Sequence, residues 1–394
     1  MNRRRFLGNL SGAVAGILTP AGSVVSGFAR WSAPQTSRRS DITRRKVIVI
    51  VFGGGTRYSE SMGDPGHRYV PRLWNELVPR GTLFTNVRVE GRVVHPNCTA
   101  SIVTGHREYD EDNDWSGAVK HPTIFEILRK SRAAPDTTAW AFVYASILSK
   151  IGHSRATGFG PGFGANVVEP PTIPRETAER VGALLQKVSV AGSTTAELDA
   201  AREAAQWVRA ESHINRGGLR SDIASRFLDE KFAAWKSGSG TTSHDAFLTE
   251  TAIACMKRFE PQAIVLAFGE IDCAHYGSWS RYVEAIRRTD ELVWRVWGTA
   301  QDLKGYRGQT LMLILPDHGR ELERTGGLGY VHHSNFYTRE GEDEGCRRIW
   351  MLMLGPRIEP GRTVLREVPQ TAAAANALRF LGLEPSPRAA ESVL

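Results

Sequence analysis

The sequence predicts an α/β fold with three layers, in which helices cover both faces of a mostly parallel β-sheet. Several short runs are continuously apolar and rich in β-branched residues, which is typical of strands buried on both faces. Helical patterns separate these runs, and strands that alternate with helices indicate a parallel sheet. The 394 residues are enough for one large domain or two ordinary ones.

The first predicted strand covers residues 46–52, and four runs of the same kind follow it. They are residues 139–144, 263–268, 310–315 and 349–354. Helical patterns are found at residues 122–130, 282–297 and 371–383. Ligands of such sheets bind outside the carboxyl ends of the strands, so polar residues that follow these runs are the candidates for a functional site.

The alternation of predicted strands and helices is interrupted between about residues 152 and 240. A loop rich in glycine and proline (residues 158–174) precedes three helical patterns, at residues 175–188, 195–209 and 222–236. We interpret this stretch as an insertion that forms a cap or side lobe over the site. The main domain is then expected to cover residues 46–394.

The N-terminus is predicted to be an export signal (residues 1–29) followed by a linker (residues 30–45). Residues 2–8 resemble the twin-arginine pattern, a weakly apolar stretch follows, and Gly27-Phe28-Ala29 offers a cleavage site. These features predict export to the periplasm or cell envelope, with membrane contact only through an uncleaved signal. A basic, disordered tail is the alternative.

The distribution of charge argues against a nucleic-acid partner. The net charge is +8, but residues 1–46 hold nine basic residues and one acidic residue, so the other residues balance at 41 of each sign. Four widely spaced cysteines without a C-x-x-C pair argue against a zinc knuckle or a dense disulfide framework, although one or two bridges stay open.

Two short segments pair an Asp with a His directly after predicted strands. They are Asp272 with His275, and Asp317 with His318. Carboxylate and imidazole are ligands that zinc accepts, and two divalent ions about 4 Å apart can neutralise a phosphate or sulfate ester and activate a nucleophile. The pair His332-His333 offers one further ligand. Taken alone, Asp317-His318-Gly319 is also compatible with a simple Asx turn.

These motifs and their order resemble the alkaline phosphatase superfamily, which includes phosphodiesterases, sulfatases and phosphomutases. The matching segments are residues 47–55 (first strand and metal-binding turn), 96–105 (nucleophile segment), 272–290, 315–319 and 355–383. The resemblance implies the three-layer fold of that superfamily and one or two divalent ions, with zinc expected. It also implies that the substrate is a small-molecule ester of phosphate, sulfate or phosphonate. By position, Asp272, His275 and one of His332/His333 would form the first metal site, and Asp317 and His318 would contribute to the second.

The sequence also departs from the superfamily at two places. The first strand ends in Gly53-Gly54-Gly55, which we interpret as a tight turn, and no carboxylate follows until Glu60. The position of the usual hydroxyl nucleophile falls on Val94 when aligned on Pro96, or on His95 when counted back from Thr104-Gly105.

Two alternatives follow from these departures. In the first, the enzyme is active with a rebuilt second site. Glu60 or His95 is then a ligand, and Thr99, Ser101 or a metal-activated hydroxide is the nucleophile. In the second, the chain is a catalytically degenerate relative that binds a metal or another ligand in the cell envelope.

Overall fold

The computed structural model describes residues 42–109, 115, 117–185, 194–238, 243–322, 328–333, 343–386, 389 and 392–393. The predicted signal, its cleavage site and most of the predicted linker lie outside these ranges. Within them, none of the helices combines the length and the apolar composition needed to cross a membrane.

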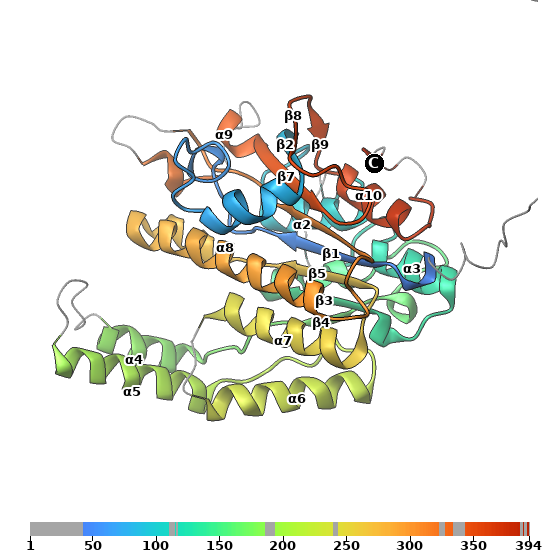
Figure 1. Cartoon of the computed structure of the whole chain (residues 1–394). Helices are drawn as coiled ribbons and strands as arrows, with labels where there is room; N and C mark the ends of the chain where they lie inside the picture. The colour runs from blue at the N-terminus through green and yellow to red at the C-terminus, as the bar shows by residue number, and fades with distance from the viewer. Residues whose placement is uncertain are drawn as a thin grey trace, which may run out of the picture.

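A mixed, mostly parallel sheet forms the centre of the molecule (Figure 1). Its strands are β1 (Lys46–Val51), β2 (Gly81–Arg88), β3 (Ala139–Val143), β4 (Asn166–Val168), β5 (Ala263–Ala267), β6 (Thr310–Leu315), β7 (Arg348–Leu354), β8 (Arg362–Val364) and β9 (Val368–Pro369). The order is β4-β3-β5-β1-β6-β7-β2-β8, and β9 also pairs with β2. Only β7 is antiparallel to its neighbours β6 and β2, so β1, β2, β5 and β6 end at the same edge.

Helices cover both faces of this sheet (Figure 1). One face carries α2 (His95–Thr104), α3 (Ile124–Arg132) and α10 (Ala372–Phe380), and the other carries α7 (His244–Phe259) and α8 (Trp279–Asp302). Alternate side chains of the fully buried β1 enter two separate cores. Val47, Val49 and Val51 join one core, and Ile48, Ile50 and Phe52 join the other. The predicted three-layer, mostly parallel fold is therefore confirmed.

Short helices complete the connections between these elements. They are η1 (Tyr58–Glu60), the π-helix η2 (Leu73–Leu77), η3 (Val78–Arg80), η4 (Asp136–Thr138), η5 (Ser146–Gly152), η6 (Pro161–Phe163), η7 (Glu270–Tyr276), η8 (Gly329–Val331) and the one-turn α9 (Glu344–Arg347). The helix η7 is important for the site. Its first N–H groups are capped by the buried carboxylate of Asp245 on α7, which accepts hydrogen bonds from Gly269 N and Glu270 N at 3.0 Å.

The helical part of the predicted insertion forms an outer row beside α7 (Figure 1). It contains α4 (Arg175–Leu185), α5 (Thr195–Glu211) and α6 (Asp222–Ser237). Aromatic packing joins this row to the sheet, because Trp140 of β3 contacts Phe227 of α6 and Phe259 of α7 at ring-centroid distances of 5.6 and 5.5 Å. These three helices thus add a layer on the α7 face of the sheet.

The turn after β1 packs unusually closely against the loops that follow β5 and β6. Gly54 and Gly55 have φ values of +90° and +71°, a region that side chains other than glycine rarely adopt. A Cβ atom at Gly54 would lie 2.5 Å from the backbone nitrogen of Asp272, and one at Gly55 would lie 2.7 Å from His318 Cε1. The predicted tight turn therefore brings the main chain directly against two candidate ligands.

We expect Gly54→Ala to lower the free energy of unfolding by roughly 2–4 kcal/mol, because it adds both backbone strain and overlap with Asp272 N. The matched control is Gly298→Ala within α8, where a Cβ atom meets nothing within 4 Å. That change should instead stabilise the helix by about 0.5–1 kcal/mol. Chemical denaturation of both variants is the measurement, and equal stabilities would contradict the packing described for the turn.

Candidate metal centre

A cluster of histidines and aspartates lies at the edge where β1, β2, β5 and β6 end. Asp272 and His275 belong to η7, which follows β5, and Asp317 and His318 directly follow β6. His95 is the first residue of α2, and His333 follows η8. Segments up to about 240 residues apart in sequence thus meet at this edge.

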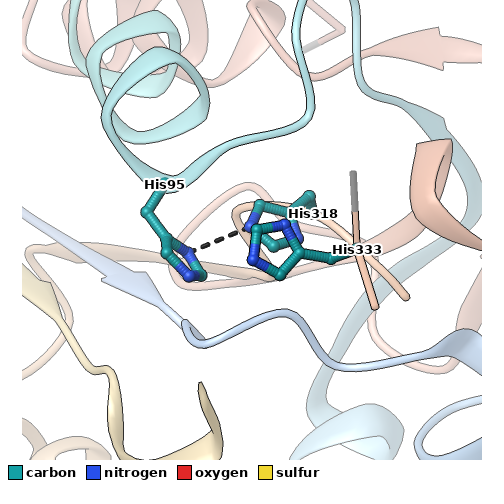
Figure 2. Close-up of side chains that lie close together, drawn as sticks. All are labelled: His95, His318 and His333. Carbon is teal, nitrogen blue, oxygen red and sulfur yellow. Dashed lines mark hydrogen bonds between the residues drawn. The ribbon is translucent and has the colours of Figure 1, made fainter. Parts of the chain in front are cut away.

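The imidazole rings of His95, His318 and His333 point toward one another (Figure 2). His318 Nε2 lies 3.0 Å from His95 Nδ1, and the ring centroids of His318 and His333 are 4.3 Å apart. Two overlapping groups have ligand atoms within 4.8 Å of one another: His95 with His318 and His333, and Asp272 with His275 and His333. His333 belongs to both groups.

Backbone carbonyl groups fix the orientation of three of these rings. The Nδ1 atoms of His275, His318 and His333 lie 2.7, 2.8 and 3.2 Å from the carbonyl oxygens of Val331, Gly319 and Val93. A carbonyl oxygen can only accept, so each Nδ1 carries the proton and donates it. In a neutral ring, Nε2 then keeps its lone pair. Histidines that bind metals are typically oriented in this way.

Burial keeps the central histidines neutral. Burial, aided by the neighbouring His95, lowers the pKa of His318 to about 4 even though Asp317 opposes this shift. Burial, His318 and His95 together hold the pKa of His333 well below its usual range. Both rings therefore present lone pairs at neutral pH, and His333 Nε2 lies 4.0 Å from Asp272 Oδ1. A lone pair that faces a carboxylate in this way repels it unless a cation lies between them.

The two carboxylates of the cluster stay ionised. Burial alone would raise the pKa of Asp272, but His275, His95 and Arg320 hold it well below its usual range. The pKa of the fully buried Asp317 is also lowered, because His318 and His95 outweigh the effect of burial. Burial lowers the pKa of His95, but Asp317, whose Oδ2 lies 2.5 Å from its Nδ1, and Asp272 raise it overall to about 9.

The residues present fit a divalent ion. The donor set combines neutral imidazoles with carboxylates, which are the ligands that zinc accepts in mixed sets. His95 Nε2 is buried and lies 3.3 Å from Asp272 Oδ1, so this nitrogen also faces the carboxylate around which the candidate ligands gather.

Other predicted site residues lie apart from this cluster. The Glu60 carboxylate is buried and bound by both arms of Arg57, at 2.5 and 2.9 Å, and also accepts a hydrogen bond from Ser59. His332 is exposed, so its neighbour His333 is the member of the pair that enters the cluster.

The predicted hydroxyl nucleophiles are buried inside α2. Thr99 lies one turn after His95 on the same helix face, is fully buried, and its Oγ1 has no hydrogen-bond partner in the described structure. Ser101 is 3% exposed and lies on a different face of the helix from His95. Neither residue belongs to the groups with metal-ligand spacing.

Two residues of the site were not found from the sequence. Arg320 is completely buried and donates hydrogen bonds to the Gly54 carbonyl and to Asp272 Oδ1, the latter at 2.7 Å. Its position two residues after His318 is the only sequence signal for it. Tyr144, directly after β3, lies edge-on to His95 at a centroid distance of 5.8 Å. Burial, with Asp317 and Asp272 nearby, raises its pKa well above 10, so its hydroxyl stays protonated.

No protein-family model and no curated protein matches this sequence. Solved structures with a similar fold include Ps i-CgsB in complex with a neocarrahexaose, with 13% identity, a TM-score of 0.55, and coverage of 88% of this chain and 74% of that chain. The PsFucS1 sulfatase from Pseudoalteromonas sp. gives 14% identity, a TM-score of 0.53, and coverages of 91% and 75%.

Two further neighbours broaden the chemistry associated with this fold. The phosphonate monoester hydrolase of Agrobacterium radiobacter shows 14% identity, a TM-score of 0.52, and coverages of 89% and 76%. A protein of the alkaline phosphatase superfamily from Vibrio parahaemolyticus shows 14% identity, a TM-score of 0.52, and coverages of 89% and 70%. The chain therefore has the fold of the alkaline phosphatase superfamily, as its motifs predicted.

Proposed function

We propose that this protein is a metal-dependent hydrolase of phosphate or sulfate esters. The observation that carries the proposal is the set of histidines whose Nδ1 atoms are tied to backbone carbonyls. This arrangement directs the Nε2 atoms of His275 and His333 toward the Asp272 carboxylate, at 3.1 and 4.0 Å. In our proposal Asp272, His275 and His333 hold one ion. When bound, a divalent ion would supply Lewis acidity, which neutralises the ester and makes water more acidic.

The charge of the site suits an anionic ester. When His95 is in the neutral form that a general base requires, Asp272, Asp317 and Arg320 give the cluster a net charge of −1, so a divalent ion would make it +1. A positive, buried site attracts a phosphate or sulfate group strongly because water screens it poorly. This balance supports esters that carry a single negative charge, such as sulfate monoesters, phosphate diesters and phosphonate monoesters.

The histidine at the start of α2 is the proposed general base. Asp317 holds His95 through Nδ1, which leaves His95 Nε2 directed into the site, 3.3 Å from Asp272 Oδ1. This nitrogen can accept a proton from an attacking water only when the ring is neutral, and a pKa of about 9 without an ion means that activity should rise with pH. The positive charge of a nearby divalent ion would lower this pKa. Carboxylate–histidine pairs of this kind orient the ring and stabilise its protonated form. A water nucleophile would also account for the histidine in place of a hydroxyl at the head of α2.

Arg320 is the proposed substitute for a second ion. The turn at Gly53–Gly55 carries no carboxylate, and Glu60 is already neutralised by Arg57. The Arg320 guanidinium lies against that turn and against Asp272, so it places a fixed positive charge there. A second divalent ion beside this buried cation would be repelled.

Export to the periplasm or cell envelope remains part of the proposal, based on the N-terminal sequence alone.

A second candidate function is ligand binding without catalysis. It is favoured by the burial of Thr99 and Ser101, because neither predicted hydroxyl nucleophile is then open to a substrate. Turnover of aryl phosphate diesters, aryl sulfates or phosphonate monoesters distinguishes the two functions, because a binding protein would show none.

Adjacent histidines provide a matched test of the metal ligands. We expect His333→Ala to weaken zinc binding at least 100-fold, since it removes a buried Nε2 ligand from the site. His332→Ala should leave affinity within about twofold, because His332 is exposed. Calorimetric titration of the metal-free protein measures both. Equal affinities would show that His333 is not a ligand.

Variants of His95 and Thr99 distinguish a water nucleophile from the Thr99 hydroxyl. His95→Ala and Asp317→Asn should each lower kcat by roughly 10²–10⁴-fold while zinc still binds, because they remove a general base or its orienting partner. Thr99→Val, which keeps the volume of the side chain, should retain turnover on the aryl ester panel. A loss of activity in Thr99→Val with normal activity in His95→Ala would reverse the assignment.

Elemental analysis of the purified chain should find one divalent ion per molecule. Arg320→Met should lower the free energy of unfolding by about 3–5 kcal/mol, because breaking a buried ion pair leaves Asp272 uncompensated. The milder variant Arg320→Lys keeps the positive charge and tests the same role if the first variant does not fold. Two ions per wild-type chain would contradict the proposed role of Arg320.

A further inference from the structure

A cavity lined by arginines lies at the opposite edge of the sheet from the metal centre. Its volume is about 410 Å³. Arg45 directly precedes β1, Thr82 is near the start of β2, and Met353 is near the end of the antiparallel β7, so the cavity lies at the amino edge of the parallel strands. A strand of six residues such as β1 spans about 20 Å, which separates the cavity from the histidine cluster.

The lining of this cavity is strongly positive. Among the residues that the structure describes, five arginines and one glutamate line it, which gives these residues a net charge of +4. The residues after 46 carry equal numbers of basic and acidic side chains, so this excess is local and does not reflect the overall composition. The arginines are Arg45, Arg357, Arg362, Arg366 and Arg379.

Most of these guanidinium groups lack an acidic partner. The only glutamate of the lining, Glu359, pairs with Arg362 at 2.8 Å. In the part of the chain that the structure describes, no side-chain hydrogen bond or ion pair engages Arg357, Arg366 or Arg379. Like charges gathered around one cavity repel one another, and a bound anion would remove that repulsion.

The floor of the cavity is apolar. Phe84, Ile358, Val364 and Phe380 line it together with Met353. Arg45, which is only 9% exposed, stacks over the Phe380 ring at 5.4 Å and donates a hydrogen bond to the Phe380 carbonyl, so it connects the apolar floor with the positive rim. The volume lies within the range of small-molecule sites, which are mostly apolar with a few convergent polar groups.

We propose that this cavity is a second binding site, for an amphiphilic anion with a phosphate or sulfate group on an apolar body. The arginine rim would bind the anionic head with bidentate hydrogen bonds, and the apolar floor would cover the body. A soluble alkyl or aryl ester and an anionic lipid both carry this chemistry. The site is independent of the metal centre and of the hydrolase proposal.

The test uses the full chain and decyl phosphate, titrated calorimetrically below its micelle concentration. Decyl phosphate should bind the wild type, and Arg366→Gln/Arg379→Gln should weaken binding about tenfold, because the variant removes two of the charged donors at the exposed rim. Inorganic phosphate should bind more weakly because it lacks the apolar body. The control is Arg155→Gln/Arg226→Gln, which removes the same charge at two exposed arginines outside the cavity.

Three results would overturn the proposal: no binding of decyl phosphate, equal weakening in the control variant, or equally strong binding of decyltrimethylammonium, which carries the opposite charge. Vesicles of phosphatidic acid, compared with phosphatidylcholine, identify the source of the anion. Sedimentation with phosphatidic acid that is lost in Arg366→Gln/Arg379→Gln assigns a lipid. Binding of decyl phosphate without sedimentation assigns a soluble ester.

Discussion

The buried guanidinium of Arg320 is the interaction on which the architecture of the candidate metal centre depends. It donates to the Gly54 carbonyl after β1, to Asp272 after β5 and, at 3.4 Å, to the carbonyl of Val331 at the end of η8. One fully buried cation therefore connects the segments that follow β1, β5 and β6. Its charge is balanced within the cluster by Asp272, which satisfies the requirement that a buried ion be paired.

The fold was largely predictable from the sequence because the central strands carry a strong local signal. The runs at residues 310–315 and 263–268 match β6 and β5 within one residue, since strands buried on both faces are apolar throughout. The strand β2 was missed because its sequence, Gly-Thr-Leu-Phe-Thr-Asn-Val-Arg, mixes polar and apolar residues and is partly exposed. The antiparallel direction of β7 is set by its pairing with β6 and β2, and no local pattern encodes such pairing.

The grouping of the candidate residues was predictable where a polar side chain follows a strand, and less so where tertiary packing decides. Their roles as metal ligands stay a prediction. Asp272, His275, Asp317 and His318 lie together because parallel strands end at one edge. The choice between His332 and His333 depends on which side chain turns inward, and a single sequence holds no signal for that. Glu60 was a reasonable candidate by position, but Arg57, three residues earlier, binds its carboxylate. Arg320 was not predicted as a site residue, because an arginine in a loop is usually solvent-exposed.

The carbonyl groups that orient the histidines have a consequence for how this fold varies. Val93 and Val331 hold the His333 and His275 rings through main-chain oxygens, so the path of the backbone orients these rings whatever side chain the two residues carry. A cluster built in this way depends on that path and on a few polar side chains. A fold shared at 13–14% identity is compatible with such a dependence.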